Sequence, residues 1–427
     1  MNSSNEKLKI MWVCNLMPAF IGEMLGITAT NKEGWITGMY EAVKQNDDII
    51  LSVIFPHTES ISGIKENIHY YGFVCDMSHP EIFEQDLTAT LRVIYEDFKP
   101  DVIHGFGTEY PYIRAILQDS EMASRTMVHI QGIMEACADN YFAGLPKKVV
   151  NSRTFRDILK KDSLVQQKEK FVKRAKSEED IFKLVKHVCG RTLFDKEYAN
   201  KKAPDAKYYK VFENLRRVFY EGHWEKEKCD KHRIFISQGN YPLKGLHFAI
   251  EAVGEVKKKY PDVSVYIAGD DIVRDNSLLN KIKEPAYGRY LKKLIKKNDL
   301  FENVHFLGAI YEKEMKEQFL KCELFVLPSV VENSPNSLGE AMLLGVPSVC
   351  SMTGGIPSMA DEGKETLYFE NMNSSSLAEK ILKLFDNEKL EKELSDNSVV
   401  RGRMNHDPES NYRMLLDVYK SIAEEKQ

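Results

Sequence analysis

Short apolar runs alternate with helix-period segments through the first third of the chain. Four runs have the length and composition of buried strands: Ile10–Cys14, Ile49–Phe55, Val102–His104 and Met127–Ile130. Amphipathic helical patterns lie between them, near residues 35–44, 87–98 and 112–118. This β-α alternation predicts a parallel sheet that is covered by helices on both faces.

Residues 233–350 repeat the same alternation independently. A chain of 427 residues is also too long for a single hydrophobic core. We therefore expect an α/β fold with two Rossmann-like doubly wound domains, residues 1–228 and 229–405, followed by a C-terminal helix within 406–427. Two such domains would place a ligand cleft between them, at the carboxyl ends of their strands.

Residues 141–225 do not follow the short β-α pattern and are expected to form a helical insertion in the first domain. The first part of this segment is strongly basic. Its basic residues are Lys147, Lys148, Arg153, Arg156, Lys160, Lys161, Lys168, Lys170, Lys173, Arg174 and Lys176. Two interpretations stay open: a solvated helical face, or a surface within 147–176 that rests on an anionic membrane, where each basic residue contributes about 1 kcal/mol.

The segment Leu324–Pro347 predicts a buried strand, a loop and a helix. Leu324–Leu327 is an apolar run bounded by Pro328. Ser334 is expected at the N-cap with Pro335 at the first helical position, and Gly345 is expected at the C-terminal end. The first N–H groups of a helix have no intrahelical partner and its dipole is positive there, so this end can bind an anion.

Two acids flank this helix start: Glu332 on the loop and Glu340 in the second helical turn. A phosphate pocket would repel carboxylates unless they bind hydroxyl groups on either side of the phosphates. A nucleotide sugar has that layout, with Glu340 at the ribose, the N–H groups of Asn336, Ser337 and Leu338 at the diphosphate, and Glu332 at the donor sugar. The alternative is an ordinary surface helix with two solvated acids.

Glu332 and Glu340 match the E-x7-E motif of retaining glycosyltransferases of family 4 (glycosyl transferases group 1), which have the GT-B fold. The resemblance continues in Thr353–Pro357 (TGGIP) and in Asp361–Lys364 (DEGK), although Ser358 stands where the family usually has Glu. Upstream, Lys244-Gly245 is similar to the family's donor-phosphate segment. The resemblance is strong over residues 230–425 and weak in the N-terminal half.

The resemblance implies roles for further residues. Lys244 would bind the donor phosphates, with Gly239 and Asn240 nearby, but Asn240 falls where the family usually has a second cation, Arg. His129, at the end of a predicted strand, would contact the donor sugar near its reacting carbon. The C-terminal helix would return to the first domain. Asp270-Asp271 is not a D-x-D pair and is expected to form a turn, so we expect catalysis without a metal or other cofactor.

Candidate residues for the acceptor side come from the first domain. They are Gly22 on the loop after the first strand, His104 and Glu109 around the end of another strand, and Arg191. The glycines of Pro18–Gly26 do not form G-x-G-x-x-G, which argues against a dinucleotide-dependent oxidoreductase.

Composition narrows the class of protein further. A net charge of −5 argues against a nucleic-acid binder. Seven cysteines without a C-x-x-C pair are typical of reduced thiols in the cytoplasm. The N-terminal residues resemble a first strand and not a secretion signal. No segment has the ~20 apolar residues of a membrane span, so we expect a cytoplasmic protein that can lie peripherally at the inner face of the membrane.

The resemblance implies a metal-independent hexosyl- or N-acetylhexosaminyltransferase. It would use a UDP-sugar, or a GDP-sugar as the second expectation, and a hydroxyl acceptor on a glycan or a lipid-linked sugar, in cell-surface polysaccharide or glycolipid assembly. Two alternatives stay open. One is a GT-B-fold sugar-nucleotide epimerase, which needs no acceptor. The other is a nucleotide-sugar-binding protein without turnover, to which the departure at Asn240 gives weight.

Overall fold

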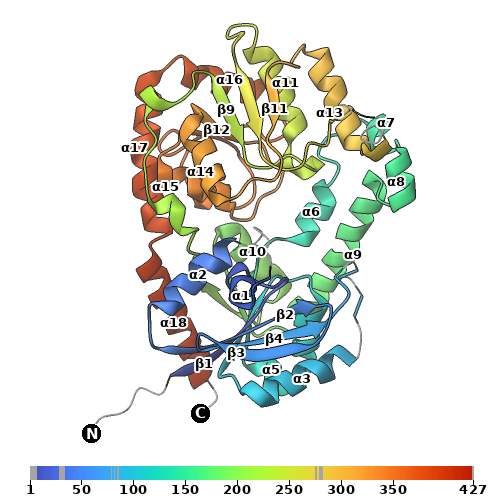
Figure 1. Cartoon of the computed structure of the whole chain (residues 1–427), viewed down its shortest axis with the longest axis vertical. Helices are drawn as coiled ribbons and strands as arrows, with labels where there is room; N and C mark the ends of the chain where they lie inside the picture. The colour runs from blue at the N-terminus through green and yellow to red at the C-terminus, as the bar shows by residue number, and fades with distance from the viewer. Residues whose placement is uncertain are drawn as a thin grey trace. The chain divides into compact units, whose positions relative to one another are not determined.

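A computed structural model describes residues 7–27, 34–77, 79–80, 82–83, 86–274, 277 and 282–425 (Figure 1). The chain divides into two compact units. Unit 1 comprises residues 1–135, 172–216 and 406–427, and unit 2 comprises residues 136–171 and 217–405. Both units are built from parallel strands and helices, as the alternating pattern predicts.

Among its described residues, unit 1 contains an eight-stranded sheet in the order β3-β4-β2-β1-β5-β6-β7-β8. The strands are β1 (Leu8–Val13), β2 (Ile49–His57), β3 (Ile61–Lys65), β4 (Ile68–Val74), β5 (Val102–Phe106), β6 (Thr126–His129), β7 (His187–Gly190) and β8 (Lys207–Lys210). All neighbours are parallel except β3 and β4, which form an antiparallel hairpin. The predicted apolar runs correspond to β1, β2, β5 and β6.

Helices lie on both faces of this sheet, with α3 and α5 on one side and α1 and α2 on the other (Figure 1). The helices of unit 1 are α1 (Ala19–Leu25), α2 (Gly34–Lys44), α3 (Asp86–Phe98), α4 (Pro111–Gln118), α5 (Ser120–Ser124), α10 (Leu193–Lys202) and α18 (Pro408–Glu424). The C-terminal helix α18 packs Leu415, Tyr419 and Ile422 into the same core as Ile10 and Trp12.

The expected helical insertion over residues 141–225 is wrong in its second half. Residues 187–210 supply β7, α10 and β8 to the unit 1 sheet. The strands β7 (HVCG) and β8 (KYYK) are only four residues long and contain few apolar residues. They therefore do not form the apolar runs from which a strand could be predicted. Helix α10 starts from a capping box of Thr192 and Asp195, which is a local signal for a helix between two strands. Residues 136–171 belong to unit 2 and not to the first unit.

Unit 2 contains a parallel six-stranded sheet in the order β11-β10-β9-β12-β13-β14 among its described residues. The strands are β9 (Arg233–Ile236), β10 (Ser264–Ile267), β11 (Val304–Phe306), β12 (Leu324–Leu327), β13 (Ser348–Ser351) and β14 (Leu367–Phe369). The chain runs outward from β9 to β11 and then returns to the other side of β9 at β12. This reversal is a topological switch point, where ligands of doubly wound sheets bind at the carboxyl ends of the strands.

The helices of unit 2 differ in how much they contribute to its core. They are α7 (Lys147–Val150), α8 (Phe155–Lys160), α11 (Leu246–Val256), α13 (Ala286–Lys297), α14 (Glu312–Lys321), α15 (Asn336–Leu344), α16 (Ser374–Phe385) and α17 (Glu388–Asn405), with 3-10 turns η1 (Arg217–Tyr220), η2 (Lys226–Lys228), η3 (Pro242–Lys244) and η4 (Ile356–Ser358). Helices α6 (Met134–Asn140) and α9 (Leu164–Phe182) each contain residues of both units. Within the described part of the chain, no helix is both long enough and apolar enough to cross a bilayer.

Candidate functional site

The loops that follow β9 and β12 contact each other closely at the switch point of unit 2. The Val330 N–H donates to the Leu243 carbonyl at 2.8 Å. Gly245 has a φ of +66°, and a Cβ placed there would lie 1.8 Å from the Pro328 carbonyl oxygen. Only glycine fits this contact. The Lys-Gly pair of the sequence therefore fixes the position of Lys244 against the loop that carries Glu332.

Lys244 and Glu332 form an ion pair in these two loops. The Lys244 Nζ lies 2.6 Å from Glu332 Oε1, and the two side chains are 19% and 13% exposed. Burial acts to lower the pKa of Lys244, but the Glu332 carboxylate and Tyr241 outweigh it, so the pKa is raised. Lys244 therefore stays charged at neutral pH. The pair offers one cation and one carboxylate that a ligand can reach.

The backbone of Glu332 is held by the Thr353-Gly354-Gly355 segment. Gly354 has a φ of +53°, and a Cβ there would lie 1.9 Å from the Glu332 carbonyl oxygen. The Gly355 N–H donates to that oxygen at 3.0 Å, and the Thr353 hydroxyl donates to the Val330 carbonyl at 2.8 Å. The T-G-G motif thus supports the Glu332 loop through close backbone contact.

Helix α15 begins two residues after the predicted N-cap. Pro335, with extended backbone, occupies the N-cap position and offers no side-chain cap, so the prediction of Ser334 at this position is wrong. The Ser334 hydroxyl instead lies 3.6 Å from the Met359 sulfur. Of the predicted diphosphate residues, Asn336 and Ser337 are half-buried and Leu338 is buried.

Further along the same helix, Glu340 is 4% exposed. It lies in the second turn of α15, as predicted, and is not one of two solvated surface acids. Gly345 ends the helix in the left-handed conformation with a φ of +77°. This confirms the predicted C-terminal signal.

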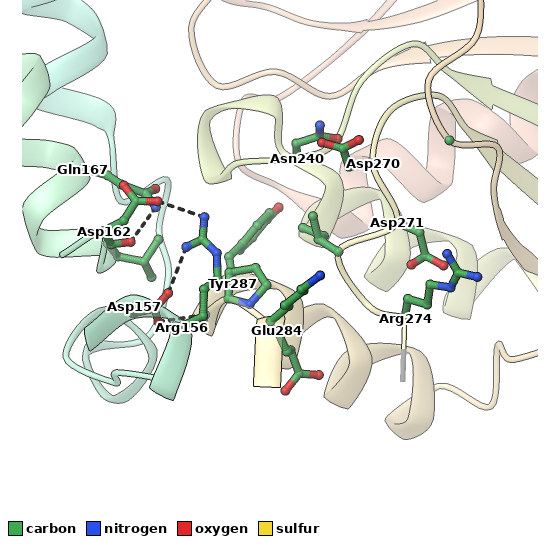
Figure 2. A pocket seen from close by; sticks show the side chains of 16 residues that line it. Arg156, Asp157, Asp162, Gln167, Asn240, Asp270, Asp271, Arg274, Glu284 and Tyr287 are labelled. Carbon is green, nitrogen blue, oxygen red and sulfur yellow. Dashed lines mark hydrogen bonds and ion pairs between the residues drawn. The ribbon is translucent and has the colours of Figure 1, made fainter. Parts of the chain in front are cut away.

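Beside these loops, unit 2 contains a cavity of about 550 Å³ (Figure 2). Asn240, Asp270 and Gly308 line it from the ends of β9, β10 and β11. Gly239, just before Asn240, is buried and packs on Leu246. The Asp271 carboxylate accepts from the Val273 N–H at 3.1 Å, as the predicted turn requires.

The opposite wall of the cavity comes from residues 156–167. The Arg156 guanidinium bridges Asp157 at 3.2 Å and Asp162 at 3.0 Å. Asp157 also accepts from the N–H groups of Thr154 and Ala286 at 3.0 and 3.1 Å. Ala286 is the first residue of α13, whose N-cap, Pro285, has no capping side chain. Asp157 therefore caps α13 and fixes α8 to unit 2.

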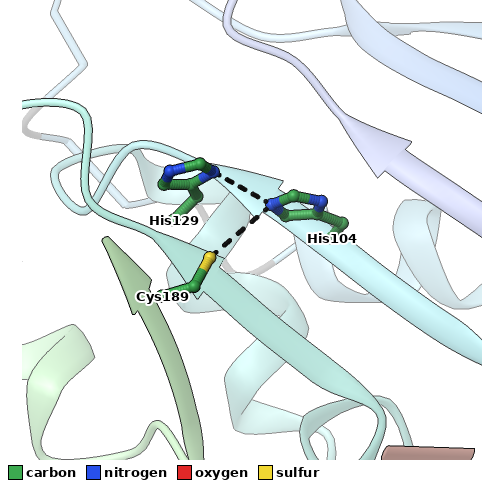
Figure 3. Close-up of side chains that lie close together, drawn as sticks. All are labelled: His104, His129 and Cys189. Atoms are coloured by element: carbon green, nitrogen blue, oxygen red, sulfur yellow. Dashed lines mark hydrogen bonds between the residues drawn. The ribbon is translucent and has the colours of Figure 1, made fainter. Parts of the chain in front are cut away.

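In unit 1, strands β5, β6 and β7 bring His104, His129 and Cys189 together (Figure 3). His104 Nε2 lies 3.3 Å from His129 Nδ1 and 3.8 Å from Cys189 Sγ. All three side chains are fully buried. Burial lowers the pKa of His104 to about 3 and that of His129 well below its usual value. Both imidazoles are therefore neutral.

A chain of hydrogen bonds joins these histidines to Trp12 and Tyr419. The Trp12 Nε1–H donates to the Tyr419 hydroxyl at 3.0 Å, and that hydroxyl lies 2.7 Å from His104 Nδ1. With Trp12 donating to it, the Tyr419 hydroxyl is placed to donate its own proton to His104 Nδ1. In that arrangement His104 carries its proton on Nε2 and donates to His129 Nδ1. His129 then carries its proton on Nε2, which lies 3.6 Å from Glu213 Oε1.

The same three residues form a group that could hold a metal ion. Their ligand atoms lie within 4.8 Å of one another. Cysteine binds metals as thiolate, and burial raises the pKa of the Cys189 thiol well above its usual value. The neutral hydrogen-bond chain already accounts for the arrangement. The expectation of metal-independent chemistry stays a prediction.

The predicted acceptor residues occupy different places in unit 1. Gly22 lies inside helix α1 and not on a loop; a seven-residue helix is too short for the pattern to reveal it. Arg191 is buried and paired with Glu213, next to His129. Glu109 is 7% exposed, and burial raises its pKa while Arg174 opposes that effect. Only Arg191 and His104 therefore gather around His129.

Four residues of this cluster did not emerge from the sequence: Trp12, Cys189, Glu213 and Tyr419. Cys189 lies in the run HVCG, which becomes β7 but is too short to have given a strand signal. Tyr419 joins the cluster from a helix more than 300 residues away from His104 in the chain, so no local pattern could have connected them.

Residues 221–400 match the model of the family described as glycosyl transferases group 1. The match lies entirely within unit 2. An uncharacterized glycosyltransferase of Methanocaldococcus jannaschii is 27% identical over 38% of this chain and 44% of its own length. An N,N'-diacetylbacillosaminyl-diphospho-undecaprenol alpha-1,3-N-acetylgalactosaminyltransferase of Campylobacter jejuni is 35% identical over 22% of this chain and 25% of its own. The chain thus spans less than half the length of these relatives.

Solved structures resemble nearly the whole chain. Sucrose-phosphate synthase from Thermosynechococcus elongatus has a TM-score of 0.71 at 12% identity, covering 97% of this chain and 99% of that one. HepE of Anabaena, solved in complex with UDP, has a TM-score of 0.65 at 14% identity, covering 97% and 100%. The fold is therefore GT-B, and the similarity to group 1 glycosyl transferases covers residues 221–400.

Proposed function

We propose that the chain is a retaining glycosyltransferase of family 4 that moves a hexosyl or N-acetylhexosaminyl group from a nucleoside-diphosphate sugar to a hydroxyl acceptor. The observation that carries the proposal is the Lys244–Glu332 pair at the switch point of unit 2, within the family-matching segment. The UDP and UDP-glucose bound to HepE support a UDP-sugar ahead of a GDP-sugar.

In this proposal the donor takes over both members of the pair. The diphosphate binds Lys244 and the first N–H groups of α15, at Asn336–Leu338, which stabilise the negative charge of the leaving group without a metal. Glu332 accepts hydrogen bonds from the sugar hydroxyls, and Glu340 binds the ribose. Exchange of an internal ion pair for ligand contacts leaves no buried charge unpaired.

The remaining steps follow the family resemblance. His129 lies beside the reacting carbon, and its neutral state suits a polar contact with an uncharged sugar. The acceptor hydroxyl attacks on the face from which the diphosphate leaves, and the leaving phosphate takes its proton. The anomeric carbon then keeps its configuration. The acceptor is a glycan or a lipid-linked sugar, and the diphospho-undecaprenol in the Campylobacter relative's name supports the lipid-linked one. The setting is cell-surface polysaccharide or glycolipid assembly, which the names of a teichuronic acid and a colanic acid biosynthesis relative support. The protein acts in the cytoplasm or at the inner face of the membrane.

A nucleotide-sugar-binding protein without turnover is the second candidate, and Asn240 is the observation that favours it. Asn240, which lines the cavity together with Asp270, stands at the position where the family usually has a cation. Lys244 is therefore the cation that remains in this loop segment. A sugar-nucleotide epimerase would use the same donor contacts without an acceptor.

Two measurements test the proposal. UDP, GDP and ADP are compared by thermal shift, since a ligand at about 100 times its Kd adds about 2.7 kcal/mol. Release of nucleoside diphosphate is then measured from a panel of donors. We expect release with one donor, and its loss in Glu332→Gln but not in Glu379→Gln, a control on the exposed side of α16. Unchanged release in Glu332→Gln would show that the assigned role of Glu332 is wrong.

A further inference from the structure

Helix α8 has two faces with opposite surroundings. Arg156 and Asp157 face the cavity and α13 of unit 2. Phe155, Ile158 and Leu159 are 62%, 63% and 72% exposed. Their spacing of i, i+3 and i+4 places them on one side of the helix. Single exposed apolar residues are ordinary, but three large ones on one turn form a patch that favours a partner surface.

Exposed positive charge surrounds this patch. Residues 146–161 contain six basic residues and one acid, Asp157, which is buried and paired with Arg156. The other five basic residues are exposed, and none of them forms an ion pair with a described residue. They are Lys147, Lys148, Arg153, Lys160 and Lys161. The segment is thus clearly cationic on a chain whose net charge is −5.

The basic residues that follow in unit 2, Lys168 and Lys170, lack this character. Lys170 pairs with Asp162 at 3.3 Å, and Lys168 is half-buried, with its Nζ 4.8 Å from the centre of the Phe142 ring. Within the part of the basic segment that belongs to unit 2, the exposed cations without an ion-pair partner among the described residues therefore concentrate around α7 and α8.

We propose that Phe155, Ile158 and Leu159, with Arg153, Lys160 and Lys161, form a docking surface for an anionic lipid bilayer, which we name the α8 surface. Apolar side chains on a helix face enter the boundary between headgroups and acyl chains, while flanking Lys and Arg bind the lipid phosphates. The combination of both in one short helix fits a lipid surface better than an acidic protein, which would leave the apolar side chains in water.

The anchoring of α8 makes this surface rigid. Asp157 joins α8 to α13 through the Ala286 N–H, and Thr154 and Asp157 form a capping box at the start of α8. A fixed helix loses little conformational freedom when it binds. Membrane docking does not depend on turnover; if the proposed function also holds, docking would bring the cavity wall at Arg156 close to a lipid-linked acceptor.

The test is vesicle flotation of the full chain, which requires no donor or acceptor. Vesicles of phosphatidylcholine alone are compared with vesicles of equal parts phosphatidylcholine and phosphatidylglycerol, at low and high salt. Variant one is Phe155→Ser with Ile158→Ser and Leu159→Ser. Its matched control is Val400→Ser with Met404→Ser on α17, which are 62% and 68% exposed in the same unit.

A charge variant, Lys160→Glu with Lys161→Glu, is matched by Lys296→Glu with Lys297→Glu, an exposed pair at the end of α13. We expect flotation with anionic vesicles only, weakened by salt. Each α8 variant should lower the bound fraction by about tenfold or more, while both controls float as the parent does. Unchanged thermal unfolding would show that the α8 variants are folded, because all substituted residues are exposed.

Three outcomes would overturn the proposal. In the first, the parent chain stays in the unbound fraction with both vesicle types. In the second, the α8 variants float as the controls do. In the third, light scattering shows a dimer that the apolar variant converts to a monomer, which would identify the patch as a contact between copies of the chain. None of these results depends on catalysis, so they are distinct from a failure of the proposed function.

Discussion

The two candidate clusters are built in opposite ways. In unit 2, Lys244 and Glu332 are charged, partly exposed and carried by loops. In unit 1, His104, His129 and Cys189 are neutral, fully buried and carried by strands that pair directly with one another. Strand pairing alone positions the buried cluster. The loop pair needs additional close contacts, which the glycines at positions 245 and 354 provide.

This difference suggests a division of roles. In the proposed function, the Lys244–Glu332 pair exchanges its internal contact for contacts to the diphosphate and the sugar of the donor. The cluster of His104, His129 and Cys189 is neutral, so it has no ion pair that a ligand could replace. It can contribute hydrogen-bond donors and acceptors in fixed positions. If this is correct, the position of the Lys244–Glu332 pair requires the glycines at 245 and 354. The protonation of His104 and His129 requires the hydrogen bond from Tyr419.

The largest effect is expected for Gly245→Ala. A methyl group 1.8 Å from the Pro328 carbonyl oxygen, added to a positive φ, should separate the two loops and destabilise unit 2 by more than about 4 kcal/mol. Gly363→Ala is the control, since Gly363 has a similar φ of +71° with nothing within 4 Å of its Cβ position. It should cost only about 1–2 kcal/mol. Denaturant unfolding measures both, and equal costs would contradict the packing argument.

The second prediction concerns the charged pair itself. Lys244→Met should lower nucleoside diphosphate release by about 100-fold, because the leaving group loses its cation. It also leaves Glu332 without its ion-pair partner and should reduce stability. Adding Glu332→Gln should restore stability but not activity. Steady-state kinetics and thermal unfolding of the single and double variants separate these effects, and a double variant with restored activity would remove the pair from the proposed mechanism.

Much of unit 2 could be predicted from sequence because its signals are local. The run LFVL, the Pro335 that precedes α15 and Gly345 at its end lie within one short segment. The fold class followed from the strand and helix alternation. The close contacts of Gly245 with Pro328 and of Gly354 with Glu332 could not be predicted, because each joins separate loops.

Unit 1 was harder to predict for the same physical reason. Its β3–β4 hairpin turns at Glu66 and Asn67, both with positive φ, and lacks a glycine that would mark the turn. Its cluster joins strands from three segments to Tyr419 of α18. Residues 187–210 gave no strand signal because β7 and β8 are short.

The third prediction is a pH dependence in unit 1. Glu178 is fully buried, and burial raises its pKa to about 7, although Thr108 and Tyr198 donate hydrogen bonds to it. The folded chain then holds this proton more firmly than the unfolded chain, whose glutamate titrates near 4.5. Stability should therefore fall as pH rises from about 5 to about 7, by on the order of 3 kcal/mol.

Glu178→Gln should flatten this slope, since the amide has no charge to bury. Denaturant unfolding of parent and variant at several pH values measures the difference. Glu391 in unit 2 also has a pKa raised to about 7, by burial, so a residual slope is expected in the variant. Parallel slopes for parent and variant would contradict the assignment to Glu178.

The smallest effect is expected for Tyr419→Phe, which removes one hydroxyl from the buried cluster. Trp12 Nε1 loses its acceptor and His104 Nδ1 loses its donor, at a cost of about 1–3 kcal/mol. His104 is then free to carry its proton on Nδ1, so His129 Nδ1 no longer receives a hydrogen bond from it. Histidine ¹⁵N shifts should report a changed tautomer at both residues.

Tyr412→Phe is the matched control on the same helix, because its hydroxyl bonds to Asp48 at 3.2 Å and does not contact either histidine. It should leave both tautomers unchanged. If Tyr419→Phe also leaves them unchanged, the hydrogen-bond chain does not determine the state of His129. The cluster of His104, His129 and Cys189 would then be a packing feature of the unit 1 core. The Lys244–Glu332 pair of unit 2 would be left as the candidate binding site of the two clusters.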